Sequence, residues 1–207
     1  MNLEFWGAGT ARTLRPIWVA EELNLKYLLH PIGPRTGETQ TEDYKALNPK
    51  QKIPCIRNNE FLLSESVAIC RYLQGLKNSP NLFKPSDPES IALEDQWCNF
   101  IYGELDETSL YVMRRHYDLK AIYGSSSIVV ESCREYFYRN LKVIENTLHN
   151  QDTLFGYDFG LADILLVTCL DWAVAYDFEL PENISSYHKK IKLRDGYKKA
   201  VKINYGL

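Results

Sequence analysis

The sequence predicts an α/β domain at residues 1–77, a linker at residues 78–90 and an all-helical domain at residues 91–207. Three observations lead to this fold class. Short runs of β-strand type alternate with helical runs in the first part. Three prolines interrupt the linker, and apolar residues recur at three- and four-residue spacing in the last part.

The predicted elements of the α/β domain run in the order strand, helix, strand, uncertain middle segment, strand, strand and helix. The segments that carry them are LEFW, RPIWVAEEL, KYLLHPI, IPCIRN, EFLLS and ESVAICRYL. Asn58 and Asn59 stand between the last two strands. Because Asn tolerates positive φ better than most residues, this pair favours a tight hairpin turn.

The helical domain is predicted to contain helices at residues 91–117, 132–148 and 160–176. The last of these segments is apolar almost all round. A helix with no polar face is typical of the centre of a bundle, so we expect this one to be buried.

Composition excludes several classes of function. The chain has 207 residues, 45% of them hydrophobic, and a net charge of -3 with charges of both signs interspersed. Such a surface lacks the basic face that nucleic acid requires. No apolar run approaches the roughly 20 residues needed to cross a bilayer, and the N-terminus has no signal-peptide pattern. We therefore expect a cytoplasmic protein with neither nucleic acid nor a membrane as partner.

The cysteines and histidines predict no disulfide framework and no metal site. Five cysteines are widely spaced without a CxxC pair, which is typical of reduced thiols. The four histidines match no known ligand spacing.

The segment NPKQKIPCI, residues 48–56, suggests a binding site. Ile53 and Pro54 stand at the entry to a strand, where a cis X-Pro bond is tolerated. A cis bond would leave the Ile53 backbone free to pair with an extended, peptide-like ligand, while Lys52 could meet a carboxylate. The alternative is that Pro54 merely begins an edge strand.

A second binding signal follows in LLSESVAICRYL. Glu65 and Ser66 stand where a helix begins, and the N-terminus of a helix attracts a carboxylate. Glu65 could hold an ammonium group, so one amino-acid head group would satisfy both. The alternative is an ordinary capped helix, because Ser is a favoured N-cap residue.

Three segments together resemble the cytosolic glutathione S-transferase family over the whole chain. They are LRPIWVAEELNL, NPKQKIPCI followed ten residues later by SES, and GYDFGLADILL. The resemblance implies a thioredoxin-like N-terminal domain, an all-helical C-terminal domain and glutathione as co-substrate, with no metal. It also implies a binding role for five residues: Ile53 before cis Pro54 pairs with the cysteinyl backbone, Lys52 faces the glycyl carboxylate, and Glu65 with Ser66 holds the γ-glutamyl end.

The family's chemistry is activation of the glutathione thiol, for which a hydroxyl donor or a helix N-terminus is needed. Phe5 stands where tyrosine-type members keep their phenol. Ala11 stands where serine-type and cysteine-type members keep their Ser or Cys. Neither side chain can donate a hydrogen bond. Thr10 is the preferred candidate, since some bacterial members similarly have threonine there. Thr13 is expected to cap the helix, and Arg12 is a secondary candidate for charge stabilisation. The alternative is that all three serve loop geometry and capping only.

The third segment departs from the family pattern. The family usually has Ser or Thr where this chain has Gly160, forming a capping box with Asp163. Half of that box is missing here. Because Gly is an acceptable N-cap residue, we expect the helix to form with Asp163 in its first turn.

The resemblance implies that an electrophilic acceptor binds between the domains. Tyr111, Arg114 and Tyr117 are the candidates for its pocket. The alternative is that aromatic residues in a helical bundle are simply part of the core.

The expected function is therefore transfer of the glutathione thiolate to a hydrophobic electrophile, as in detoxification, by a cytosolic homodimer. Two alternatives stay open. One is another glutathione-dependent reaction, such as peroxide reduction or isomerisation. The other is a non-catalytic interaction protein that retains the fold.

Overall fold

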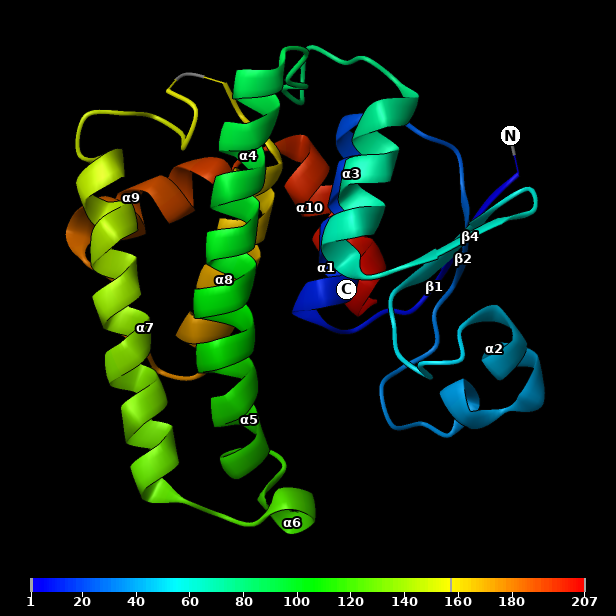
Figure 1. Ribbon diagram of the computed structural model, residues 1–207, viewed down its shortest axis with the longest axis horizontal. Helices are drawn as coiled ribbons and strands as arrows, with labels where there is room; N and C mark the ends of the chain where they lie inside the picture. The colour runs from blue at the N-terminus through cyan, green and yellow to red at the C-terminus, as the bar shows by residue number, and fades with distance from the viewer. Residues whose placement is uncertain (1, 157, 207) are drawn as a thin grey trace. The chain divides into compact units, whose positions relative to one another are not determined.

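The computed structural model of the protein describes residues 2–156 and 158–206, so Tyr157 of the segment GYDFGLADILL lies outside the described residues. The chain divides into two compact units. The first comprises residues 1–84 together with 191–207, and the second comprises residues 85–190. Each unit has its own secondary-structure class, as predicted: the first is α/β and the second is helical (Figure 1).

A four-stranded mixed sheet forms the centre of the first unit. Its strands are β1 (Leu3–Trp6), β2 (Leu28–His30), β3 (Cys55–Asn58) and β4 (Phe61–Ser64), in the spatial order β2-β1-β3-β4. β1 pairs with β2 in parallel and with β3 antiparallel, and β3 pairs with β4 antiparallel. All four strands fall in the predicted segments. Asn58 pairs with Phe61, and Asn59 has the positive φ of 54° that the hairpin requires.

Helices cover both faces of the sheet (Figure 1). α1 (Ala11–Glu22) and α3 (Ser66–Leu76) pack against each other. The middle segment, for which the sequence predicts nothing definite, forms η1 (Glu38–Gln40) and α2 (Glu42–Leu47). Tyr44 of α2 packs with Trp6 and Cys55, so α2 covers the face of the sheet to which these two strand residues point.

The last helix, α10 (Asp195–Tyr205), belongs to the first unit. This differs from the predicted boundaries, in which residues 91–207 form one domain. The reason is the apolar face of α10, which packs on α1: the ring of Tyr197 lies 4.9 Å from that of Trp18. Residues 78–84 of the predicted linker also group with the first unit.

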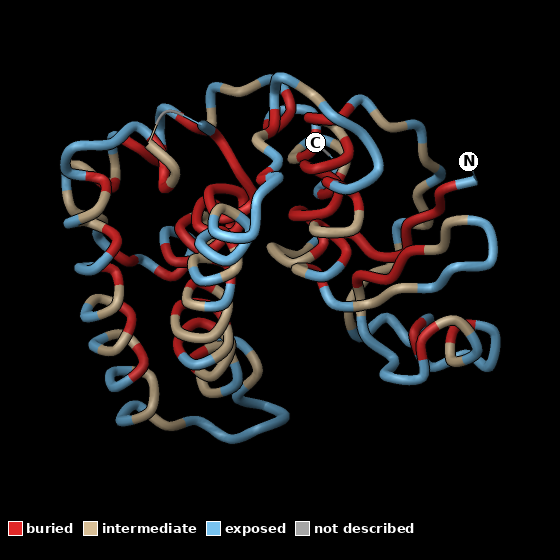
Figure 2. Tube along the Cα trace, turned by 45° about the horizontal axis from the view of Figure 1, so that its top comes forward, coloured by how far each residue is buried: buried red, intermediate tan, exposed pale blue. Residues whose placement is uncertain are grey.

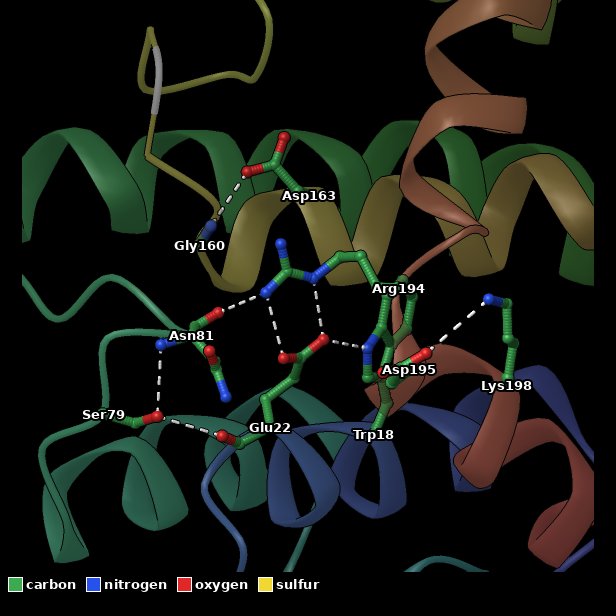
Figure 3. A network of polar contacts seen from close by, with 9 residues as sticks. All are labelled: Trp18, Glu22, Ser79, Asn81, Gly160, Asp163, Arg194, Asp195 and Lys198. Atoms are coloured by element: carbon green, nitrogen blue, oxygen red, sulfur yellow. Dashed lines mark hydrogen bonds and ion pairs between the residues drawn. The ribbon is translucent and has the colours of Figure 1, made fainter.

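A buried carboxylate fixes the chain just before α10 (Figure 3). The Arg194 guanidinium donates from Nε and Nη2 to the two oxygens of Glu22, at 2.8 and 3.0 Å. Trp18 Nε1 donates to the same carboxylate at 2.9 Å. Gly196 approaches so closely that an added Cβ would lie 2.6 Å from Glu22 Cδ. Polar contacts therefore hold the start of α10 on α1, and they leave no room for a side chain at position 196.

The second unit is built from long helices. α4 (Pro88–Phe100), the π-helical segment η2 (Ile101–Tyr111) and α5 (Val112–His116) follow without interruption, as the prediction for residues 91–117 requires. The chain continues through α6 (Lys120–Tyr123), α7 (Ser127–Leu148), α8 (Leu161–Ala175) and α9 (Glu182–Ile191). Every residue from 161 to 170 of α8 is buried, which confirms the prediction of a buried helix (Figure 2).

The N-terminus of α8 is capped by two carboxylates. Asp163 accepts from the amides of Gly160 at 2.9 Å and Leu154 at 3.0 Å. Glu94 of α4 accepts from the amide of Leu161 at 3.1 Å. The Asp163 half of the capping box is therefore present, and Glu94 provides a further acceptor at a helix whose N-cap, Gly160, has no hydroxyl.

Candidate functional site

The loop between β1 and α1 contacts the segment before β3 through Gly7. Gly7 has a φ of 118°, and a Cβ placed on it would lie 2.6 Å from Ile53 Cβ and 2.9 Å from Thr13 Cγ2. A side chain at position 7 is excluded by both the φ angle and the space. Glycine thus brings two of the sequence-predicted groups of residues, those around Thr13 and those around Ile53, into direct proximity.

Thr10 and Thr13 form a reciprocal cap at the start of α1. Thr10 is the N-cap residue, and its Oγ1 accepts from the amide of Thr13 at 3.0 Å. Thr13 Oγ1 accepts from the amide of Thr10 at 3.0 Å. The expectation that Thr13 caps the helix therefore needs correction: Thr10 is the N-cap, and Thr13 is the third helical residue, which closes the box.

The two hydroxyl groups differ in what they can offer a ligand. Thr13 is fully buried, and its hydroxyl lies 2.7 Å from Asn204 Oδ1 and 2.9 Å from the Thr10 carbonyl, two acceptors for one proton. Thr10 is half-buried, and Thr13 Oγ1 at 3.0 Å is the one acceptor for its hydroxyl among the described residues. Thr10 is therefore the better placed of the two to donate to a bound molecule.

Asn204 of α10 contacts this loop, and no sequence pattern predicted it. Its side-chain Nδ2 donates to the Thr10 carbonyl at 3.1 Å, and its backbone carbonyl accepts from the amide of Gly9 at 2.8 Å. Asn204 is 2% exposed. No local signal marks it, because a single Asn in the last turn of a helix is common on surfaces, and its partners lie at the other end of the chain.

Phe5, Ala11 and Arg12 are the other sequence-predicted positions around this loop. Phe5 is buried, and its ring lies 4.6 Å from that of Tyr27. Ala11 and Arg12, in the first turn of α1, are half-buried. The amide of Ala11 has no hydrogen-bond partner among the described residues, and such amides at a helix N-terminus favour a negative charge.

The peptide bond between Ile53 and Pro54 is cis, as predicted. Neither the amide nor the carbonyl of Ile53 hydrogen-bonds to a described residue. Lys52 is exposed, and its carbonyl accepts from Tyr44 Oη at 2.8 Å and Asn48 Nδ2 at 2.7 Å. The backbone on one side of Ile53 is thus anchored, while that of Ile53 itself can pair with a ligand.

Glu65 and Ser66 stand at the start of α3 with different surroundings. Glu65 is exposed, has a φ of 73°, and forms an ion pair of 2.7 Å with Lys50. Ser66 is buried, and its hydroxyl accepts from Arg15 Nη1 at 3.3 Å. Lys50 is a second residue that the sequence analysis missed, because it is 15 residues away from its partner.

The residues predicted for an acceptor pocket lie in the helical unit. Tyr111 ends η2, and the guanidinium of Arg115 lies 5.1 Å from the centre of its ring. Arg114 is half-buried in α5. Tyr117 follows α5, is exposed, and packs its ring 5.3 Å from that of Tyr176.

The cysteines are unsuited to nucleophilic chemistry. All five are free and buried. Burial raises the pKa of the Cys55 thiol to about 11 and that of Cys70 to about 12, so both are protonated at neutral pH. Among residues 2–156 and 158–206, no group of three His, Cys, Asp or Glu side chains could hold a metal ion. The described helices include none with the length and apolar character needed to cross a membrane.

Comparison with known proteins agrees with this fold. Residues 1–75 match the family model "Glutathione S-transferase, N-terminal domain", and residues 104–195 match "Glutathione S-transferase, C-terminal domain". The probable glutathione S-transferase GSTF2 of Oryza sativa subsp. japonica is 35% identical over 152 residues, which cover 72% of this chain and 70% of that protein.

Two solved structures are similar along nearly the whole chain. The delta-class glutathione transferase of Nilaparvata lugens has a TM-score of 0.84 at 25% identity, covering 96% of this chain and 92% of that one. The theta-class glutathione S-transferase of Xanthomonas axonopodis pv. citri, solved with glutathione bound, has a TM-score of 0.79 at 24% identity, covering 96% of each chain. The chain therefore belongs to the glutathione S-transferase family.

Proposed function

We propose that the protein is a glutathione transferase that conjugates the thiolate of glutathione to a hydrophobic, electrophilic small molecule. The observation that carries this proposal is the contact made at Gly7, since it sets the half-exposed N-cap of α1 beside the unpaired backbone of Ile53. A peptide thiol paired with Ile53 would have its sulfur close to the start of α1.

The binding part of the proposal assigns each end of glutathione to a polar group. The Ile53 backbone pairs with the cysteinyl residue beside cis Pro54, and the Lys52 ammonium faces the glycyl carboxylate. Glu65 and Ser66 hold the γ-glutamyl end, with the Glu65 carboxylate accepting from the ligand's ammonium group. Lys50 lies 2.7 Å from the Glu65 carboxylate, so the ligand's ammonium group would share this carboxylate with Lys50 or displace it.

The chemical part of the proposal assigns thiol activation to Thr10. A free thiol has a pKa of about 8.5, so a donor aimed at the sulfur is needed to favour the thiolate at neutral pH. The Thr10 hydroxyl supplies that hydrogen bond, Arg12 adds positive charge, and Thr13 holds Thr10 in place. The thiol proton leaves to solvent.

The bond-forming step takes place on the acceptor. The sulfur lone pair forms a bond to the electrophilic carbon, and a leaving group departs with its electron pair, or an adjacent atom gains a proton after addition. Tyr111, Arg114 and Tyr117 supply the acceptor pocket. The protein's contribution is orientation and charge stabilisation rather than a covalent intermediate on the enzyme.

The direct test uses the purified protein with glutathione and a panel of electrophiles of different reactivity. We expect retention on immobilised glutathione and conjugation of at least one electrophile. Lys52→Ala and Glu65→Gln are expected to raise the KM for glutathione with little change in kcat, because both groups contact parts of the ligand that do not react. A protein that neither binds glutathione nor conjugates any electrophile overturns the proposal.

A non-catalytic glutathione-binding role is the second candidate, and one observation favours it. Phe5 and Ala11 occupy the two positions where a donor is usual in the family. The two candidates are separated by combining a thermal-shift titration with glutathione and the turnover assay. Stabilisation by glutathione without turnover supports the non-catalytic role.

A redox reaction through a protein cysteine is disfavoured by the buried thiols with raised pKa values. We expect Cys55→Ser to retain the glutathione-dependent activity of the wild type. Loss of activity in this variant, with the fold intact by circular dichroism, would point to a cysteine-based peroxide reduction instead.

The proposal includes a cytosolic location and a two-fold homodimer, as is typical of the family. Phe61 and Leu62 of the edge strand β4 are exposed in the single chain, 47% and 39%, and offer apolar surface to a second subunit. Light scattering is expected to give twice the mass of one chain. A monomer mass at micromolar concentration contradicts the dimer.

A further inference from the structure

Asn204 of the C-terminal helix α10 contacts the start of α1 and the loop that carries Thr10. Three hydrogen bonds form this contact. The Gly9 amide donates to the backbone carbonyl of Asn204 at 2.8 Å, Asn204 Nδ2 donates to the Thr10 carbonyl at 3.1 Å, and the Thr13 hydroxyl donates to Asn204 Oδ1 at 2.7 Å. The side chain of Asn204 thus contacts both members of the threonine pair, one through its donor and the other through its acceptor.

We propose that Asn204 is a positioning residue for thiol activation: it holds the Thr10 hydroxyl in the orientation that stabilises the glutathione thiolate. This inference rests on the proposed function and adds a residue from the opposite end of the chain to it. Asn204 does not touch the sulfur. It acts through the backbone of Thr10 and the side chain of Thr13.

The physical reason is preorganisation. A donor that points at a developing charge is effective when its position is fixed before the ligand binds. The Thr10 hydroxyl is fixed by the amide of Thr13, and Thr13 is fixed by Asn204. Without the Asn204 side chain, the buried Thr13 hydroxyl turns to its other acceptor, the Thr10 carbonyl, and that carbonyl loses the Nδ2 donor.

The helix that carries Asn204 is itself held rigidly. At its start, Arg194 donates two hydrogen bonds to the buried carboxylate of Glu22, and Gly196 lies against that carboxylate (Figure 3). Tyr197 packs on Trp18 one turn further along. Both anchors lie on α1, so the same helix that begins with the Thr10 cap also fixes the element that braces this cap.

The test compares Asn204→Leu and Asn204→Ala with Lys199→Ala, an exposed change on α10. Asn204→Leu removes both side-chain hydrogen bonds at similar volume. Asn204→Ala removes the same two hydrogen bonds without adding a charge or a larger apolar group, so the proposal stays testable if the first variant fails to fold. The readouts are the pH profile of kcat/KM for glutathione and the ultraviolet titration of the thiolate in the enzyme–glutathione complex.

We expect both Asn204 variants to move the acid limb of the profile up by about one pH unit, with a roughly tenfold loss of kcat/KM below it, because weaker stabilisation raises the thiol pKa. The KM for glutathione is expected to stay within about twofold, since ligand pairing at Ile53 is untouched. Lys199→Ala should match the wild type. In a double-mutant cycle, Thr13→Val should add little to Asn204→Leu, because both remove the same link.

Two results overturn the inference while leaving the proposed function intact. One is a wild-type pH profile in both Asn204 variants, accompanied only by a lower melting temperature. The other is additivity with Thr13→Val. An inactive wild-type protein that still binds glutathione overturns the transferase function alone, because the thiolate titration then still measures the effect of Asn204. Absence of glutathione binding overturns both.

Discussion

At the scale of single residues, the candidate site depends on two hydroxyl groups with unequal freedom. Thr13 has its proton committed to acceptors inside the protein, whereas Thr10 keeps a hydroxyl at a half-buried position. The same side chain that caps α1 is therefore the one available to a sulfur atom. Capping and catalysis are compatible, because the cap uses a lone pair of Thr10 Oγ1 and donation uses its proton.

Thr10→Val is the corresponding prediction. It removes both functions, so we expect kcat to fall by about a hundredfold, the range seen when one preorganised donor is lost. Loss of the N-cap costs about 1 kcal/mol of folding free energy. Steady-state kinetics and urea denaturation measure the two effects separately. Thr10→Ser keeps the hydroxyl and is the matched control; an equal loss in both variants would show that the hydroxyl is not responsible.

A second residue-scale prediction concerns Gly7→Ala. The added methyl group would lie 2.6 Å from Ile53 Cβ at a φ of 118°. We expect a loss of about 3 kcal/mol in unfolding free energy from strain and overlap, and weaker glutathione binding because Ile53 is displaced. Gly9→Ala is the control: its φ is 79° but nothing lies within 4 Å of an added Cβ, so the backbone cost of about 1 kcal/mol should stand alone.

At the scale of elements, α8 begins where two carboxylates replace a missing hydroxyl. Asp163 is completely buried and accepts from two amides and from Tyr187 Oη at 2.7 Å. Burial raises its pKa from 3.8 to about 6, and the nearby Glu94 charge adds to the rise, while the hydrogen bonds oppose it. Folding therefore favours the protonated form of this carboxyl group.

The sign of the resulting pH dependence follows from this rise. Below about pH 4, Asp163 is protonated in both states and its contribution is fully present. As pH rises from about 4 to about 6, the unfolded chain releases the proton first and stability falls, by about 3 kcal/mol for a pKa difference of this size. Above that window the contribution does not change further.

Asp163→Asn tests this dependence. We expect the variant to be less stable overall, since the amide has fewer acceptor sites, but to lack the fall between about pH 4 and 6. Urea denaturation of both proteins across this range gives the difference, in which carboxylates common to both cancel. A constant difference between wild type and variant at all pH values contradicts the raised pKa.

The elements were predictable where the signal is local. β1, the hairpin at Asn59 and the buried α8 all follow from periodicity and turn residues within a few positions. The threonine cap at Thr10 carries a local signal too, but the same residue types at positions 10 and 13 leave open which one is the N-cap. Thr13 is the predicted cap, whereas the N-cap in the structure is Thr10.

The remaining contacts could not be predicted from the sequence, because they join residues that are far apart along the chain. Asn204 is 191 residues from Thr13, and Glu94 is 67 residues from Leu161. Arg15 reaches Ser66 across 51 residues. Pairings of this kind are decided by how the elements pack, so neither propensity nor spacing in one sequence indicates them.

At the scale of the whole molecule, the first unit is made from both ends of the chain. Residues 1–84 hold the sheet and the candidate site, and residues 191–207 complete the packing of α1. The domain boundary could not be read from composition, since α10 is as helical as the elements before it. What distinguishes α10 from those elements is that its buried face packs on α1 of the first unit.

Removing residues 195–207 tests this division. Trp18, fully buried beside Tyr197, would become exposed, so we expect the first unit to unfold at much lower temperature and glutathione binding to be lost. The helices of residues 85–190 should persist, leaving a reduced far-ultraviolet helical signal with its own transition. A chain ending at residue 205 keeps Asn204 and is the control. Glutathione binding by the shorter chain would contradict the assignment of α10 to the first unit.

The link between Gly9, Thr13 and Asn204 also has a consequence for the order of events during synthesis. The loop is made early, but its brace is made 191 residues later, about 10 to 40 seconds at ordinary rates of translation. Residues 85–190 form an uninterrupted unit and can fold as they emerge, whereas the sheet unit waits for its last helix. In a nascent chain the candidate site is therefore completed after the helical unit, although it is encoded first.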